Sequence, residues 1–187
     1  MSDKNGFTLA SGQKLKGGGT VVGGLILSGG GVLAPGASPG TLTVASNMTW
    51  GGGGVYEWEV QNWTGIAGAT NGWDLIKITS GTADPTLDIT ATSGDKFVIK
   101  IQEYNLVNVV TNASKSFTIL QADSAITGFS ADKFTLDTTG WSKGGTWEIG
   151  QVGNNDITLT YIPEPGTMLM LGIGGAVLAW RRRRFVK

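Results

Sequence analysis

The sequence predicts an all-β protein that ends in one short hydrophobic helix. Glycine accounts for 31 of the 187 residues, far above its usual share, and it separates short apolar segments in the first part of the chain. Longer segments rich in Val, Ile and Thr follow from residue 74, and these residue types favour strands. An uninterrupted apolar run covers residues 168–180. We therefore expect a β-rich body over residues 1–162 and a separate tail over residues 163–187.

The N-terminal part of the body has the pattern of a β-solenoid. From Gly12 to Gly54, glycine clusters alternate with apolar pieces that are too short for helices. Glycine also disfavours helix wherever it occurs in an element interior. Short strands joined by tight glycine corners suit stacked coils, each of which buries a few apolar side chains. We expect this architecture to continue to about residue 70.

One segment of this part resembles a known repeat. Residues 33–43 read Leu-Ala-Pro-Gly-Ala-Ser-Pro-Gly-Thr-Leu-Thr. With its flanks, from Gly30 to Val44, the segment resembles the autotransporter-associated β-strand repeat. That resemblance implies a secreted domain of parallel β-helix form. The sequence contains one full copy.

The segment Val55–Val60 alternates strictly between apolar and acidic residues. This period of two predicts a strand with one apolar and one polar face. The apolar face holds Tyr56, Trp58 and Val60, and the polar face holds Glu57 and Glu59. Two carboxylates at this spacing lie about 7 Å apart, which is near the separation found in glycosidases. The alternative is an ordinary solvated strand face.

The second half of the body carries longer candidate strands and fewer glycines. Turn residues separate them, and the short connections favour antiparallel pairing. We expect this half to form a sandwich-like structure or a flattened continuation of the solenoid. The candidate strands are 74–79, 86–92, 96–103, 106–110, 116–120, 133–137, 146–149 and 156–162.

The composition excludes several kinds of chemistry. The chain has no histidine and no cysteine, so it contains no Ser-His-Asp triad, Cys-His pair or imidazole or thiolate metal site. Arginine is absent before residue 181, which removes the arginine base of pectate-lyase-type enzymes. We expect a non-enzymatic protein without cofactor or metal. Five polar residues could hold calcium if the fold brought them together, although turn capping is the simpler role: Asp132, Asp137, Asn154, Asn155 and Asp156.

Tryptophan is the residue type most suggestive of a ligand. Aromatic side chains on a strand face can stack on sugar rings, but tryptophan also fills protein cores. Four tryptophans are the candidate glycan contacts: Trp50, Trp58, Trp63 and Trp73. Asn47, Asn62 and Asn112 each begin an Asn-x-Ser/Thr sequence and are expected at the surface.

The charge of the body argues against a nucleic-acid partner. Five of the fourteen basic residues lie in residues 181–187, and Glu164 is the one acid after residue 162. Nine lysines and thirteen acids therefore remain, a net charge of about −4. A mildly acidic body does not bind a phosphate backbone well.

The tail has the composition of a membrane-inserted segment. Thirteen residues of helix span about 20 Å, less than the ~30 Å of a bilayer core, so a helix docked on the body is the alternative. Arginine side chains that reach the headgroups extend the effective span, and Arg181–Arg184 directly follow the run. Basic residues stay on the cytoplasmic side, which places residues 1–162 outside. We expect residues 166–180 to lie in the inner membrane.

The order of parts in residues 162–187 resembles the PEP-CTERM sorting signal. Pro163-Glu164-Pro165 precedes the apolar run, and the cluster Arg181, Arg182, Arg183 and Arg184 follows it. The resemblance implies recognition of the triplet by an exosortase-type membrane protease, removal of the helix, and release to the cell surface or extracellular matrix of a Gram-negative-type bacterium. The two prolines keep the triplet extended and end any helix there.

These observations predict an exported, non-catalytic surface or matrix protein. Its expected partners are the protease, the membrane and extracellular polysaccharide; a carbohydrate-binding module or adhesin that uses the tryptophans is the alternative. Residues 1–5 are polar and show no signal peptide, although an outward-facing body needs an export signal. We therefore expect the sequence to be a fragment or to have a misplaced start.

Overall fold

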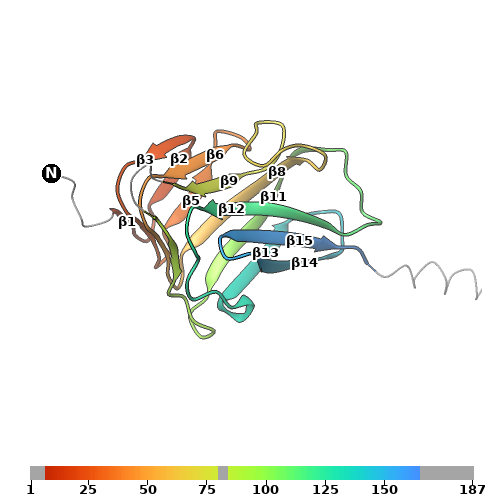
Figure 1. The fold of residues 1–187 in the computed structure, drawn as a ribbon. Helices are drawn as coiled ribbons and strands as arrows, with labels where there is room; N and C mark the ends of the chain where they lie inside the picture. Colours follow the sequence, from red (N-terminus) through yellow and green to blue (C-terminus); the bar gives the residue numbers. More distant parts are fainter. Residues whose placement is uncertain (1–6, 80–83, 165–187) are drawn as a thin grey trace, which may run out of the picture.

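The body is built from three β-sheets that wrap around one core (Figure 1). The computed structural model describes residues 7–79 and 84–164. Its first twelve strands follow one another around the three sheets in a fixed order, so that each turn of the chain adds one strand to each sheet. The last three strands extend two of the sheets. This is the arrangement of a β-solenoid, and it confirms the prediction of an all-β fold with stacked coils.

The sheets contain four, five and six strands among the described residues. Sheet A has the order β1 (Phe7–Leu9), β4 (Leu25–Leu27), β7 (Met48–Trp50) and β10 (Leu87–Ile89). Sheet B has the order β13 (Phe134–Gly140), β11 (Phe97–Val107), β8 (Val55–Asn62), β5 (Val32–Pro35) and β2 (Lys14–Gly17). Sheet C has the order β14 (Thr146–Val152), β15 (Asp156–Ile162), β12 (Lys115–Ala122), β9 (Leu75–Ile78), β6 (Thr41–Val44) and β3 (Gly19–Val21).

The parallel register places residues at equivalent positions of successive coils above one another. In sheet A, Leu9 pairs with Leu27, Leu27 with Trp50, and Trp50 with Ile89. All four of these side chains are buried. Every coil therefore contributes apolar side chains to one continuous column, and their burial is the main favourable term for folding.

Glycine allows the coils to turn without a side chain in the way. Gly36 adopts a φ of +80°, and a Cβ there would lie 2.0 Å from the carbonyl oxygen of Ser38. This corner joins β5 to β6 within the repeat-like segment. At Gly54, before β8, a Cβ would lie 2.5 Å from the carbonyl oxygen of Leu27. Both positions hold glycine because the backbone of a neighbour approaches closely.

The second half continues the solenoid instead of forming a sandwich-like unit of its own. Strands β10, β11 and β12 pair in parallel with the coil before them, so both halves share the same three sheets. The antiparallel pairs among the described strands are β12–β15 and β14–β15. A short 3-10 helix, η1 (Ala131–Lys133), leads into β13. The expected antiparallel pairing thus holds for the final hairpin. Of the predicted strand over 106–110, residues 106 and 107 form the end of β11, and residues 108–110 lie outside any strand.

The four tryptophans considered as glycan contacts belong to the core, which corrects that expectation. Trp50 and Trp58 are fully buried, Trp63 is 2% exposed and Trp73 is 7% exposed. Trp50 stacks on Phe97 with ring centroids 4.6 Å apart, while the other three pack edge-on against Phe117. Glycine-rich coils carry few large side chains, and these rings supply the missing volume. No ring face of theirs is free for a sugar.

One carboxyl group is buried where two coils meet. Asp74, just before β9, is 1% exposed. Its Oδ1 accepts a hydrogen bond from the Gly40 backbone N–H at 2.8 Å, and its Oδ2 accepts one from the Glu59 N–H at 3.0 Å. The indole of Trp58 donates to its backbone carbonyl at 3.0 Å. Burial raises the pKa of Asp74 to about 8, although the two N–H donors pull it the other way.

Candidate functional site

The end of β15 is where the body connects to the tail. β15 lies between β12 and β14, so both of its edges are hydrogen-bonded. Its last residue, Ile162, pairs with Thr146 of β14, and the preceding Tyr161 pairs with Lys115 of β12. The chain therefore leaves the sheet at Ile162 and enters Pro163 with no linker between them. In Figure 1 this exit lies at the same end as the loop between β11 and β12.

The first residues of the predicted sorting triplet are visible at this exit. Pro163 is half-buried and Glu164 is exposed. One carboxylate oxygen of Glu164, Oε1, accepts a hydrogen bond from the backbone N–H of Gly145 at 3.3 Å. Burial, and then the charge of Glu164, raises the pKa of the Tyr161 hydroxyl. The acid of the triplet therefore lies against the folded body.

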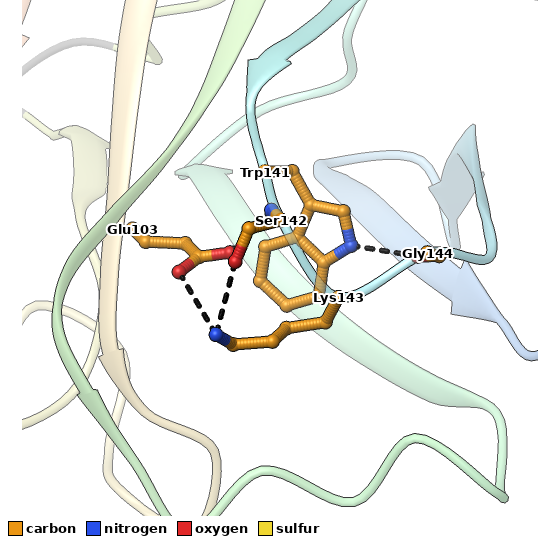
Figure 2. A network of polar contacts seen from close by, with 5 residues as sticks. All are labelled: Glu103, Trp141, Ser142, Lys143 and Gly144. Carbon is orange, nitrogen blue, oxygen red and sulfur yellow. Dashed lines mark hydrogen bonds and ion pairs between the residues drawn. The ribbon is translucent and has the colours of Figure 1, made fainter.

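Gly145 belongs to a turn that links β13 to β14, which we name the exit turn (residues 141–145). Figure 2 shows how its side chains are held. The Ser142 backbone N–H donates to Oε1 of Glu103 at 2.5 Å, and the Lys143 ammonium lies 3.5 Å from Oε2 of the same carboxylate. The indole N–H of Trp141 donates to the Gly144 carbonyl at 2.8 Å. Glu103 of β11 and the indole thus fix both ends of the turn.

The exit turn also rests on a cluster of aromatic rings. Trp141 stacks on Trp63 with a centroid separation of 5.9 Å and an interplanar angle of 17°. It meets Trp147 edge-on at 5.1 Å and Tyr161 at 5.7 Å. A Cβ on Gly145 would lie 2.4 Å from the Tyr161 ring, so the glycine allows the turn to touch β15. Aromatic contacts of this kind add to the area they bury.

Glu57 and Glu59 lie on the outer face of β8, as the alternation predicted. Both are half-buried, between neighbouring strands of sheet B. Glu57 forms an ion pair with Lys14 at 2.5 Å, and it stands in register with Lys100 of β11. Glu57 is occupied by its ion pair with Lys14, so this face has the character of a structural ladder of charges.

The residues considered for calcium lie on separate elements. Asp132 belongs to η1, Asp137 to β13, and the other three to the end of the hairpin β14–β15. Asp137 accepts hydrogen bonds from the hydroxyl and backbone N–H of Thr139, which lower its pKa. Asn155 donates to the Ala122 carbonyl. The part of the chain that the structure describes holds no group of three acids, histidines or cysteines suited to a metal.

The comparison with protein families identifies the tail. The model of the PEP-CTERM protein-sorting motif matches residues 162–184. Residues 162–184 carry a PEP-CTERM sorting motif. Its first matched residue, Ile162, is the last residue of β15. No curated protein matches the sequence.

The motif supports export and targeting to an exosortase, which is a membrane protein. Pro165, Arg181–Arg184 and the apolar run 168–180 lie outside the described residues. Within residues 7–79 and 84–164, no helix has the length and hydropathy needed to cross a bilayer. The structural information on the motif therefore comes from Ile162, Pro163 and Glu164.

The exit turn was not predicted from the sequence. Gly144 and Gly145 lie between the candidate strands 133–137 and 146–149, and Glu103 is the last residue of the candidate strand 96–103. The adjacency of two glycines before a strand predicts a tight turn, but nothing local indicates that this turn meets Glu164. That contact depends on the antiparallel hairpin, which brings Thr146 opposite Ile162.

Proposed function

We propose that this protein is a non-catalytic component of a bacterial cell surface or extracellular matrix, delivered there by exosortase-type processing at its tail. The observation that carries the proposal is the PEP-CTERM match, which begins where the last strand of the body ends. The β-solenoid is the delivered product, and the protease acts near Pro163-Glu164-Pro165. Before cleavage, the apolar run lies in the inner membrane with Arg181–Arg184 on the cytoplasmic side and the body outside.

The composition and surface support a structural role over a catalytic one. Histidine and cysteine are absent from the sequence, and Glu57 is occupied by its ion pair with Lys14. The alternative of a carbohydrate-binding module lacks support from the four tryptophans named above, because all four are buried. Extracellular polysaccharide remains part of the proposal as the surroundings of the delivered protein, not as a ligand of those rings.

The decisive experiment is to recover the protein from the surface fraction of its host and to determine its intact mass and C-terminal sequence. We expect a chain that ends near residue 165 and lacks residues 168–187. Glu164→Ala should remain uncut, because it removes the acid of the triplet. Glu148→Ala is the matched control, since Glu148 is an exposed glutamate of the neighbouring strand β14. A surface-located chain that ends at Lys187 would contradict the proposal.

A further inference from the structure

We propose that the exit turn is a docking site for Glu164, which holds the sorting motif on the folded body and slows its capture by the protease. The inference rests on the proposed function and adds a control element to it. It assigns to the body a part in sorting that the motif alone does not describe.

The contact is a hydrogen bond from a glycine backbone N–H to a carboxylate. Gly144 and Gly145 have φ values of +67° and +74°, and the N–H of Gly145 points at Oε1 of Glu164. Backbone N–H groups in turns can bind anions, and the donor here is the Gly145 N–H. A Cβ on Gly144 would lie 2.8 Å from the same oxygen. A glycine at position 144 therefore leaves room for the carboxylate.

The turn is held in place without help from Glu164. Trp141 is anchored in the aromatic cluster and bonds to the Gly144 carbonyl, and Glu103 holds Ser142 and Lys143 (Figure 2). The orientation of the Gly145 N–H is therefore set by the turn itself and does not depend on the contact with Glu164. A preorganised site loses little conformational entropy on binding, which favours the docked state.

The motif has little freedom to avoid this site. Ile162 is paired in the sheet, so only Pro163 separates the fixed strand from Glu164. Proline restricts φ to about −65°, which limits the positions that the next residue can reach. The short, stiff connection keeps the carboxylate near the turn.

Docking competes with recognition because Glu164 is the one charged residue between Asp156 and Arg181. A protease that recognises the triplet through this acid must first remove it from the Gly145 N–H. The apparent affinity for the motif equals the intrinsic affinity multiplied by the fraction of chains in which the acid is free. An exposed hydrogen bond stabilises the docked state only modestly, so the cut should become faster by a limited factor when the docking is lost.

The test compares two glycine variants of the full chain in a host that carries an exosortase-type protease. Gly144→Ala places a methyl group against the Glu164 carboxylate. Gly153→Ala is the matched control, because Gly153 has a φ of +59° and lies in the turn at the other end of the same hairpin, away from Glu164. Pulse-chase labelling and intact mass give the rate at which the chain loses its tail.

We expect Gly144→Ala to be cut about three to ten times faster than Gly153→Ala. A tenfold change corresponds to about 1.4 kcal/mol. Trp141→Phe should act in the same direction, since it keeps the ring but removes the N–H that fixes Gly144; it carries the test if Gly144→Ala does not fold. If the folded variants are cut no faster than Gly153→Ala, the inference is overturned. The proposed function still stands in that case, provided that the wild-type chain is cut. An uncut wild-type chain would overturn both.

Discussion

Replacing Asp74 tests whether a buried carboxyl group joins two coils of the solenoid. Asp74→Ala leaves the backbone N–H groups of Gly40 and Glu59 without their acceptor. Each buried donor that loses its partner costs about 1–3 kcal/mol, so the variant should lose about 2–6 kcal/mol of unfolding free energy. Asp74→Asn keeps one acceptor oxygen and should lose less. Urea unfolding of the full-length protein in a non-ionic detergent measures both changes.

The same residue predicts how stability depends on pH. Burial raises the folded-state pKa of Asp74 to about 8 from the 3.8 of a solvent-exposed aspartate. Between these values the folded protein keeps a proton that the unfolded chain has released, so the stabilising contribution of the carboxyl falls as pH rises. The slope reaches at most about 1.4 kcal/mol per pH unit and ends above about pH 8. Asp74→Asn removes this contribution.

The decisive quantity is the difference in unfolding free energy between wild type and Asp74→Asn across pH 4 to 9. Subtracting the two unfolding free energies cancels the contributions of the other titrating groups. We expect the wild-type advantage to be largest near pH 4 and to decline toward pH 8. A constant difference would show that folding does not change the pKa of Asp74. A difference that grows with pH would show that the two N–H donors outweigh burial, and would refute the reasoning.

Three further substitutions test the core, the corners and the outer face. Trp50→Ala should cost about 3–5 kcal/mol, measured by urea unfolding, because it empties a fully buried site stacked on Phe97; a loss under 1 kcal/mol would contradict the assigned packing. Gly54→Ala should lower the melting temperature by several degrees, since its Cβ would lie 2.5 Å from a backbone oxygen of β4. Gly94→Ala should leave the melting temperature unchanged or slightly higher, because the nearest atom to its Cβ would be the Thr92 hydroxyl oxygen at 4.0 Å, an ordinary contact. Glu57→Gln should change stability by less than about 1 kcal/mol, and less still at high salt; a larger loss would mean that this half-exposed pair carries more than a surface ion pair does.

Local pattern was enough to predict the coils. The alternation over residues 55–60 predicted the strand β8 and its buried face, because a period of two follows from strand geometry alone. Glycine spacing likewise indicated the short strands and tight corners of the first half. The sorting motif of the tail could be predicted for a similar reason, because its proline triplet, apolar run and arginine cluster are contiguous in sequence.

Features that depend on long-range packing could not be predicted from the local sequence. The four tryptophans could have faced either way, and only the closing of the coils places them inside. Asp74 gave no signal beyond being an isolated acid between Trp73 and Leu75, because its partners come from residues 15 and 34 positions away. Similarly, the pairing of β14 with β15 brings residues 145 and 164 together, and no local pattern encodes that meeting.

The position of β15 also determines how the body bears mechanical load. A pull on the tail is transmitted through Pro163 along the axis of this strand, which has hydrogen-bonded neighbours on both sides. Antiparallel hydrogen bonds run perpendicular to the strands, so such a force loads both ladders in shear. The bonds share the tension and must fail together, whereas a strand at a sheet edge that is peeled sideways loses its bonds one at a time. The solenoid is therefore attached to its tail at a mechanically strong point.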